Sequence, residues 1–302
     1  MFLPKQVNIT EVCPRDGFQN VKDFISTEKK IEIIKGLIKA GFKKIEATSF
    51  VSPKWIPQMA DANEVMSAIK DYAKEQNVVL VGLALNAKGV ENALKADVDE
   101  INYALSVSEA HSLKNVNKTN DQAFEQFAEV VKIKGNKKLN LSFATTFGCP
   151  FGEEVPTEKI VRFAVKGMEM GADSIGLADT IGVANPLQVE EVVNAVKKEI
   201  SVDKIGMHLH DTRGLALTNA FVAIVNGIYI FETAAGGLGG CPFAPGASGN
   251  SATEDMLYML NSIGIKTGIK EDALYETVKI IKENVNTCLS SHMSTLIPEL
   301  KL

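Results

Sequence analysis

The sequence lacks the features that mark membrane, secreted and nucleic-acid-binding proteins. It has no run of about 18 apolar residues that could cross a bilayer. Its first residues lack the basic start and the apolar stretch of a signal peptide. No cluster of lysine and arginine resembles a nucleic-acid footprint, and the net charge is −5. We therefore expect a cytoplasmic protein that binds neither a membrane nor nucleic acid.

Cysteine is also scarce in this chain. The four cysteines, Cys13, Cys149, Cys241 and Cys288, are far apart, and no two of them form a C-x-x-C pair. This spacing argues against a disulfide framework and against a structural zinc site. We expect the thiols to be reduced, which agrees with a cytoplasmic location.

The sequence does contain a regular alternation of two kinds of segment. Eight short runs are rich in β-branched residues, and most of them are separated by segments with the periodicity of an amphipathic helix. The runs cover 7–12, 43–50, 78–85, 100–108, 139–147, 173–180, 204–212 and 229–237. Strands that alternate with helices predict a parallel sheet, and eight of them predict a closed (β/α)8 TIM barrel.

The competing architecture is an open, doubly wound sheet. That fold usually has a G-x-G-x-x-G fingerprint after its first strand, and residues 7–20 (VNITEVCPRDGFQN) have none. We therefore predict that residues 1–302 form a single TIM-barrel domain. Residues from about 268 to 302 are amphipathic and are predicted to form a helical C-terminal extension.

The first helix is predicted over residues 27–41. Its apolar residues, including Ile34 and Leu37, recur at helical spacing, so they should form one buried face. Thr27 is a candidate N-cap, and Gly41 is placed to end the helix.

Polar side chains follow the predicted strands at the end where barrel enzymes carry their active sites. These side chains are Arg15, Asp16, Glu46, Ser49, Asp179, His208 and His210. After the last strand comes the loop 236–250, which contains six glycines and two prolines and ends at Asn250. Such a loop cannot form part of a core; its glycines give an adaptable backbone, and it ends by offering Asn250 just before a helix predicted to start near Ala252.

His208 and His210 are two residues apart in a predicted strand, so their side chains point to the same side. Asp16 and Asn250 are nearby oxygen donors that could complete a ligand set. Two nitrogens and two oxygens suit Mg²⁺ or Mn²⁺, although the ligand types also permit iron or zinc. The simpler interpretation is that one histidine is an ordinary buried side chain, but the strand-end position favours a ligand.

Six segments of the sequence resemble the 3-hydroxy-3-methylglutaryl-CoA lyases, and they occur in the order found in that family. The segments are 7–20 (VNITEVCPRDGFQN), 45–61 (IEATSFVSPKWIPQMAD), 108–117 (SEAHSLKNVN), 177–186 (LADTIGVANP), 208–214 (HLHDTRG) and 237–255 (GLGGCPFAPGASGNSATED). The last is the most specific, with its glycine loop, cysteine, asparagine and Thr-Glu-Asp. Together the segments extend over nearly the whole chain.

The resemblance implies metal-dependent retro-aldol cleavage of (S)-3-hydroxy-3-methylglutaryl-CoA to acetyl-CoA and acetoacetate. It implies an acyl-CoA as the partner, Mg²⁺ or Mn²⁺ as the cofactor, and a homodimer or higher homo-oligomer. Matched residue by residue, the metal ligands are Asp16, His208, His210 and Asn250.

The resemblance also implies roles for the other site residues. Arg15 matches the arginine that stabilises a thioester enolate, and Cys241 matches a cysteine of proton transfer. Glu46, Asp179 and Glu254 match acidic residues that support the metal site or move the proton. The candidates for substrate binding, besides Arg15, are Gln19, Ser49 and Lys22.

Each of these assignments has a simpler interpretation. Arg15 and Asp16 could form a surface ion pair, Glu46 and Asp179 could cap loops, and Cys241 could be a small packed side chain. His111 and His292 have no paired donor at metal spacing, so we expect them at the surface or beside the substrate.

Substrate identity is open to alternatives. Cys13 and Phe18 stand where the family has glycine and leucine, and they flank Arg15 and Asp16. A related 3-hydroxyacyl-CoA, such as a citramalyl or methylmalyl ester, is therefore an alternative substrate. A condensing enzyme similar to the isopropylmalate or homocitrate synthases is the second alternative. A non-catalytic acyl-CoA or metal-binding protein is the third.

Overall fold

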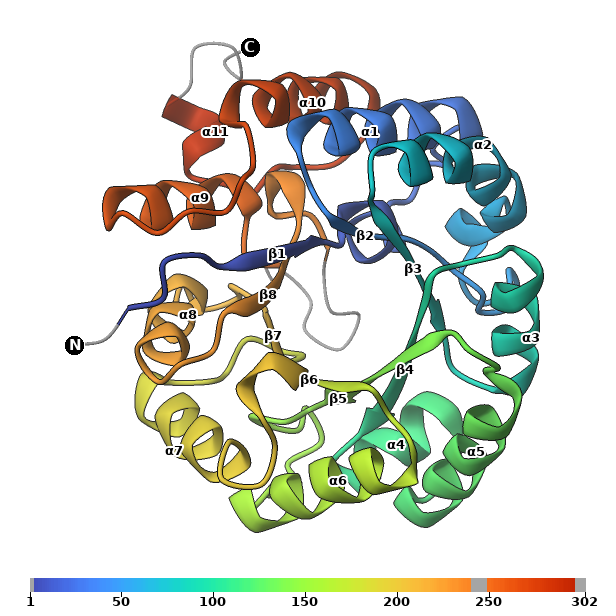
Figure 1. Cartoon of the computed structure of the whole chain (residues 1–302), viewed down its shortest axis with the longest axis vertical. Helices are drawn as coiled ribbons and strands as arrows, with labels where there is room; N and C mark the ends of the chain where they lie inside the picture. The colour runs from blue at the N-terminus through green and yellow to red at the C-terminus, as the bar shows by residue number, and fades with distance from the viewer. Residues whose placement is uncertain (1–2, 240–248, 297–302) are drawn as a thin grey trace.

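The computed structural model describes residues 3–239 and 249–296. Eight parallel strands form a closed barrel in chain order, in which β8 pairs with β1 (Figure 1). The strands are β1 (Asn8–Glu11), β2 (Lys44–Ser49), β3 (Val79–Ala84), β4 (Glu100–Ser106), β5 (Lys138–Ala144), β6 (Ser174–Asp179), β7 (Ile205–Leu209) and β8 (Ile230–Thr233). The predicted TIM barrel is confirmed, with each strand inside its predicted range or within one residue of it.

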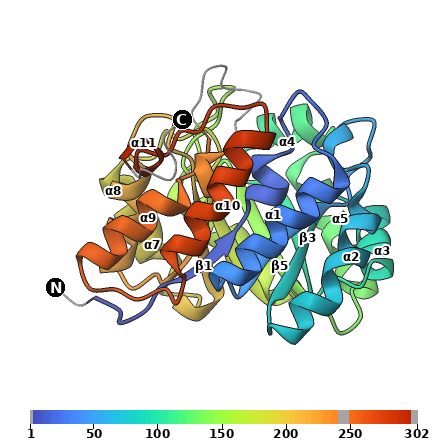
Figure 2. The same ribbon diagram turned by 90° about the horizontal axis from the view of Figure 1, so that it is seen from above.

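Helices surround the barrel on its outer side (Figures 1 and 2). They are α1 (Thr27–Ala40), α2 (Ala62–Glu75), α3 (Ala87–Lys95), α4 (Glu109–Val116), α5 (Asn120–Ile133), α6 (Thr157–Met170), α7 (Pro186–Val196), α8 (Ala216–Val225), α9 (Thr253–Ser262), α10 (Glu271–Asn284) and α11 (Met293–Leu296). Short helical turns occur at η1 (Cys13–Gly17), η2 (Pro57–Met59), η3 (Val202–Lys204) and η4 (Ala235–Gly237). Among the described residues, no helix is long and apolar enough to span a bilayer.

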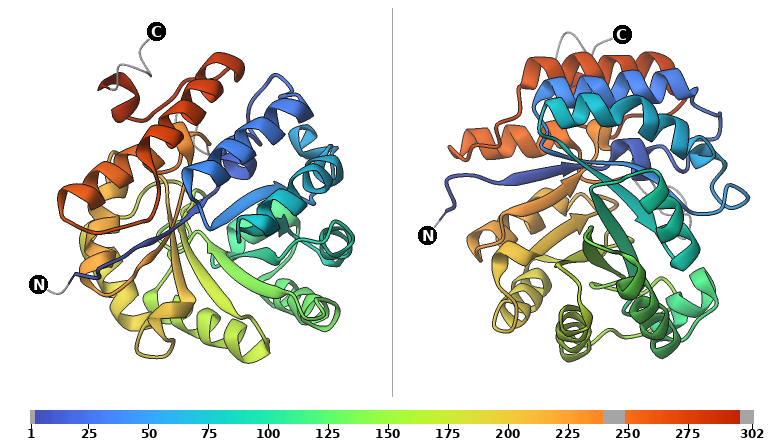
Figure 3. Two further views of the ribbon diagram at one scale, coloured as in Figure 1. Left: turned by 45° about the horizontal axis from the view of Figure 1, so that its top comes forward. Right: turned by 45° about the vertical axis from the view of Figure 1, so that its right-hand side comes forward.

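Of the two described helices after residue 268, α10 packs on the barrel's first helix, and α11 contacts α9. Figure 3 shows α10 lying beside α1, and the two helices are in direct contact. The hydroxyl-bearing side chain of Thr277 on α10 lies so close to Gly36 on α1 that a Cβ at Gly36 would be 2.5 Å from Thr277 Oγ1. The close approach of these two helices therefore depends on a glycine at position 36.

The start of α1 corrects one sequence prediction. The N-cap is Ser26, whose side chain accepts a hydrogen bond from the Lys29 N–H at 3.3 Å, whereas Thr27 is the first helical residue. Thr27 instead donates its hydroxyl hydrogen bond to Asp61 at 2.8 Å. Gly41 ends the helix as predicted, with a φ of 105° that favours glycine.

The two faces of the strands have different chemistry. On β4, Tyr103 points outward and packs its ring 5.6 Å from that of Phe127 on α5. Its neighbour Asn102 points inward and donates a hydrogen bond to Glu46 of β2. Because successive side chains of a strand alternate in direction, Tyr103 faces the helices and Asn102 faces the barrel interior. The site therefore lies inside the barrel, toward the ends of the strands.

Candidate active site

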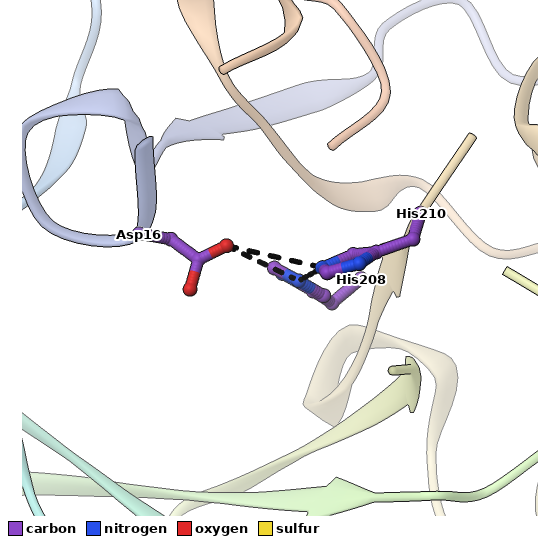
Figure 4. A group of neighbouring side chains, drawn as sticks. All are labelled: Asp16, His208 and His210. Atoms are coloured by element: carbon purple, nitrogen blue, oxygen red, sulfur yellow. Dashed lines mark hydrogen bonds and ion pairs between the residues drawn. The ribbon is translucent and has the colours of Figure 1, made fainter. Parts of the chain in front are cut away.

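Asp16, His208 and His210 converge at the C-terminal ends of β1 and β7 (Figure 4). His208 lies in β7, His210 follows its last residue, and Asp16 lies in the turn η1 after β1. The two Nε2 atoms are 3.0 Å apart, and the Asp16 Oδ2 atom is 4.0 Å from that of His208 and 3.8 Å from that of His210. One donor atom from each residue therefore faces a common point.

The spacing of these three atoms suits a small divalent cation. For a triangle with sides of 3.0, 3.8 and 4.0 Å, the point equidistant from all three corners lies about 2.1 Å from each, which is the distance that Mg²⁺ prefers for its ligands. Burial, followed by the charge of His208, lowers the pKa of His210 to about 4. His210 is therefore neutral near pH 7, as a metal ligand must be.

Asn250 lies beside the same point. Its backbone forms a β-bridge with His210, and its Nδ2 donates hydrogen bonds to Asp16 Oδ2 at 2.7 Å and to the Leu238 carbonyl at 2.8 Å. Its buried Oδ1 has no hydrogen-bond partner in the described part of the chain. Because a buried acceptor without a partner is costly, Oδ1 is suited to a metal ion. The donor set therefore fits the group that the sequence predicts.

Glu232 orients His208, and sequence reasoning did not assign it this role. Its Oε2 lies 2.8 Å from His208 Nδ1, which leaves Nε2 directed at the common point. Burial opposes a charge on His208, but the hydrogen bond and charge of Glu232 outweigh it and raise the His208 pKa. A carboxylate behind a ligating histidine is a usual feature of metal sites. An acid in the apolar segment 229–237 was the signal available in the sequence.

Arg15 is buried between two carboxylates. Its Nε donates to Glu46 Oε2 at 2.5 Å, and its Nη1 forms an ion pair with Asp16 Oδ1. Burial alone would lower its pKa, but the charges of Glu46 and Asp16 outweigh this effect and raise it. Arg15 therefore keeps a fixed positive charge beside the triad, and the simpler interpretation of a surface ion pair is wrong.

The two carboxylate oxygens of Asp16 contact different groups. Oδ1 accepts hydrogen bonds from Arg15 and from Gln19 Nε2, the latter at 2.7 Å, and Oδ2 faces the histidines. Burial would raise the pKa of Asp16, but Arg15 and the two histidines hold it well below its usual range. The group is thus a carboxylate across the physiological pH range.

The other predicted substrate-binding residues differ in their surroundings. Gln19 joins the cluster through Asp16. Ser49 is buried, and its Oγ accepts a hydrogen bond from the Val51 N–H at 3.2 Å, so it stabilises its own loop. Lys22 is exposed between η1 and α1. Cys241 lies outside the described residues.

The carboxylates of Asp179 and Glu254 both accept hydrogen bonds from backbone N–H groups. The two oxygens of Asp179 accept hydrogen bonds from the N–H groups of Val183 and Ala184, each at 2.9 Å. Both oxygens of Glu254 face the Gly236 N–H, at 3.1 and 2.9 Å. Burial raises the pKa of Asp179, and it raises that of Glu254 to about 7.

Glu11 is a second residue that sequence reasoning missed. Its Oε1 accepts hydrogen bonds from the N–H groups of Cys13 at 2.8 Å and Ala235 at 2.9 Å, and its Oε2 accepts one from Thr253 at 2.8 Å. It therefore joins the turn of Arg15 and Asp16 to η4 and to the start of α9. A glutamate within the buried first strand was the available signal.

His111 corrects another expectation. It is buried, at 2% exposure, and its Nδ1 lies 2.6 Å from Ser106 Oγ, so a surface position is wrong, while a position beside the substrate stays a prediction. His292 is exposed as expected, and its Nδ1 lies 3.1 Å from Asp255.

Comparisons with known proteins agree on one family. The HMGL-like family model matches residues 6–281. A hydroxymethylglutaryl-CoA lyase of Bacillus subtilis is 43% identical over 95% of this chain and 96% of its own length. The mitochondrial hydroxymethylglutaryl-CoA lyase of Mus musculus is 41% identical, over 97% of this chain and 90% of its own.

A solved structure has the same fold throughout. The HMG-CoA lyase of Acinetobacter baumannii, in complex with coenzyme A and 3-methylmalate, matches with a TM-score of 0.92 and 41% identity. The match covers 96% of this chain and 95% of that one.

Proposed function

The chain belongs to the HMGL-like family, and on this premise we propose that it is a metal-dependent carbon–carbon lyase. Its substrate is 3-hydroxy-3-methylglutaryl-CoA, and its products are acetyl-CoA and acetoacetate. The observation that carries the proposal is the convergence of Asp16, His208 and His210 beside the fixed positive charge of Arg15. The chain acts as one lyase domain.

Asp16, His208, His210 and Asn250 hold the divalent cation, for which we propose Mg²⁺ or Mn²⁺. When bound, the cation supplies Lewis acidity toward the tertiary hydroxyl of the substrate. Glu232 keeps His208 in the tautomer that directs Nε2 at the site. Asn250 contributes the buried oxygen for which the described residues provide no donor.

Arg15 stabilises the charge that develops during cleavage. The substrate hydroxyl loses its proton as the bond between C2 and C3 breaks, and the electron pair of that bond moves onto the thioester as an enolate. A guanidinium does not deprotonate, so Arg15 offers a permanent positive charge to the enolate oxygen. Glu46 and Asp16 hold the guanidinium in place before the substrate arrives.

Two proton transfers complete the reaction. Asp179 is our candidate acceptor for the hydroxyl proton, because burial raises its pKa and its carboxylate retains free lone pairs beyond its two backbone bonds. Glu46 is the second candidate, although Arg15 and Asn102 already occupy both of its oxygens. Cys241, outside the described residues, is the proposed donor to C2. The proton lost from oxygen is thus balanced by one gained on carbon.

A related 3-hydroxyacyl-CoA with a larger branch at C3 is the second candidate substrate. Ala104 and Ser142 pair in register on β4 and β5, and both small side chains are half-buried. Most barrels fill such inward positions with branched aliphatic residues. Small residues at these positions leave more room inside the barrel than branched aliphatic residues would. We also propose that the protein is cytoplasmic and acts as a homodimer or higher homo-oligomer.

The test is acetyl-CoA release by metal-stripped protein, with and without added Mg²⁺ or Mn²⁺. The substrates to compare are 3-hydroxy-3-methylglutaryl-CoA, its 3-ethyl homologue and citramalyl-CoA. We expect metal-dependent cleavage with the highest kcat/KM for the first. A preference for another ester would keep the reaction and change the substrate, and no cleavage of any ester would overturn the proposal.

A further inference from the structure

A row of hydrogen-bonded polar side chains lies inside the barrel, and the reaction steps proposed above do not involve this row. Its members are Asn102 on β4, Asn140 and Ser142 on β5, and Ser174 on β6. Asn102 and Asn140 are buried, and the two serines are half-buried. TIM barrels usually fill this space with Val, Ile and Leu. An amide in such a place is costly unless it is fully hydrogen-bonded, so the pattern calls for a reason.

The hydrogen bonds along this row all run in one direction, from donor to acceptor. Ser174 Oγ donates to Asn140 Oδ1 at 2.8 Å, and Asn140 Nδ2 donates to Asn102 Oδ1 at 3.1 Å. Ser142 Oγ reinforces the second link by donating to the same Asn102 oxygen at 2.9 Å. Two donors therefore fix the oxygen end of the Asn102 amide, which leaves its Nδ2 pointing away from them.

The row of hydrogen bonds ends at the active site. Asn102 Nδ2 donates to Glu46 Oε1 at 2.8 Å, and the other oxygen of Glu46 accepts from Arg15 Nε at 2.5 Å. An ionised carboxylate only accepts, so the amide cannot be reversed without losing this bond. Glu46 is thus held from both sides, by Asn102 from the interior and by Arg15 from the mouth.

We propose that Asn102 is a positioning residue for the lyase reaction. It fixes the Glu46 carboxylate, and Glu46 in turn holds the Arg15 guanidinium where the enolate forms; Ser142 and Asn140 orient Asn102 for this task. The inference rests on the proposed function, because it assigns Asn102 a part in that reaction. Asn102 itself touches neither substrate nor metal.

The first test is Asn102→Leu, which keeps a similar volume and removes the hydrogen bonds. We expect kcat to fall by about 10- to 100-fold, as for other residues that orient a catalytic group, while KM stays within about threefold. Tyr103→Phe is the matched control, since it removes one hydrogen bond, to Gln126, from the outer face of the same strand. The control should keep wild-type kcat.

A second variant guards against a folding defect. Asn102→Asp keeps the shape and both accepted hydrogen bonds but replaces the donor with a charge like that of Glu46. It should lose at least as much kcat as Asn102→Leu. If Asn102→Asp folds and keeps more than about half of wild-type kcat, the positioning role is overturned.

A double-mutant cycle separates a positioning role from a structural one. If Asn102 acts through Glu46, then Asn102→Leu should lower kcat by less than about twofold in a Glu46→Ala background. An equal loss in both backgrounds would show that Asn102 acts independently of Glu46, which would overturn the inference.

A spectroscopic measurement makes the inference independent of turnover. The chain has only three arginines, so the ¹⁵N–¹H signals of their Nε groups can be assigned with single Arg→Lys variants. The Arg15 signal should shift and exchange faster with solvent in Asn102→Leu, and stay unchanged in Tyr103→Phe. An unchanged Arg15 signal in Asn102→Leu would overturn the positioning role. Wild-type protein without lyase activity would instead overturn the proposed function, and the Arg15 signal would still decide whether Asn102 positions Arg15.

Discussion

Two groups of acids lie close to β1, and their surroundings differ. Asp16, Glu46 and Glu232 surround Arg15 and His208, and each forms an ion pair with one of them. Glu11 and Glu254 are fully buried, and neither forms an ion pair within the described residues; they accept hydrogen bonds from backbone N–H groups. We call Asp16, Glu46 and Glu232 the paired acids, and Glu11 and Glu254 the unpaired acids.

Charged partners lower the pKa of two of the paired acids, Asp16 and Glu232, whereas burial raises the pKa of Glu46 in spite of Arg15. Burial would raise the pKa of Asp16, yet Arg15 and the histidines lower it, whereas burial raises the pKa of Glu11 to about 8 and that of Glu254 to about 7. Asp16 and Glu232 therefore supply fixed negative charge to a site that handles a cation and an enolate. The unpaired acids fasten the segments that carry the site.

Removal of the positively charged Arg15 side chain should have the largest effect. Arg15→Gln should lower kcat by about three orders of magnitude, because the enolate loses its fixed positive charge. Metal affinity should be largely retained, since Asp16 and both histidines remain. Steady-state kinetics and Mn²⁺ titration check the two expectations. Retention of more than about a tenth of the wild-type activity would remove Arg15 from this role.

Removal of a ligand should act on the metal. His210→Ala should weaken Mn²⁺ binding by about 100-fold or more, measured by calorimetry, because one of the converging donors is lost. His292→Ala removes an exposed histidine that is paired with Asp255 and does not belong to the converging donors, so it serves as the control and should bind Mn²⁺ like wild type. Equal affinity in both variants would exclude His210 from the ligand set.

The same substitution in each group tests the comparison directly. Glu232→Gln should weaken Mn²⁺ binding by about tenfold, because His208 loses its carboxylate partner. Glu11→Gln should leave Mn²⁺ affinity unchanged. If the two variants lost affinity to the same extent, the distinction between paired and unpaired acids would fail.

The smallest effect concerns the pH dependence of stability. Glu11 has its pKa raised to about 8, so the folded protein retains this proton longer than the unfolded chain does. The stability that the proton confers is complete below pH 4.5, the ordinary value of a glutamate, and is lost as the pH rises to about 8.

Glu11→Gln has no such proton, so its free energy of unfolding should fall less steeply than that of wild type between pH 5 and 8, by up to about 1 kcal/mol per pH unit. Urea unfolding at several pH values measures the two slopes. Parallel curves would show that Glu11 is ionised in the folded protein.

The sequence predicted the barrel because the evidence for it is local and repeated. Each strand carries its own apolar pattern, and each amphipathic segment predicts a helix without knowledge of its neighbours. The correction at Ser26 has a local cause, since either of two adjacent hydroxyl residues could cap the helix. In the folded chain, Asp61 engages the hydroxyl of Thr27, and Ser26 is left to cap the helix.

The site was only partly predictable, because its contacts join residues that are far apart in the sequence. The spacing of His208 and His210 is local, but their approach to Asp16 depends on β1 and β7 lying across β8 in a closed barrel. The role of Glu232 depends on its pairing in register with His208 on the neighbouring strand. Partners of this kind are set by the sheet register, which the sequence pattern does not specify.

The most direct test is a crystal structure of the protein with Mn²⁺, recorded at a wavelength where manganese scatters anomalously. We predict a single manganese peak about 2.1 Å from Asp16 Oδ2 and from both histidine Nε2 atoms, with Asn250 Oδ1 turned toward it. A manganese peak elsewhere, or none in crystals of protein that cleaves its substrate with Mn²⁺, would contradict the metal-dependent mechanism at this site.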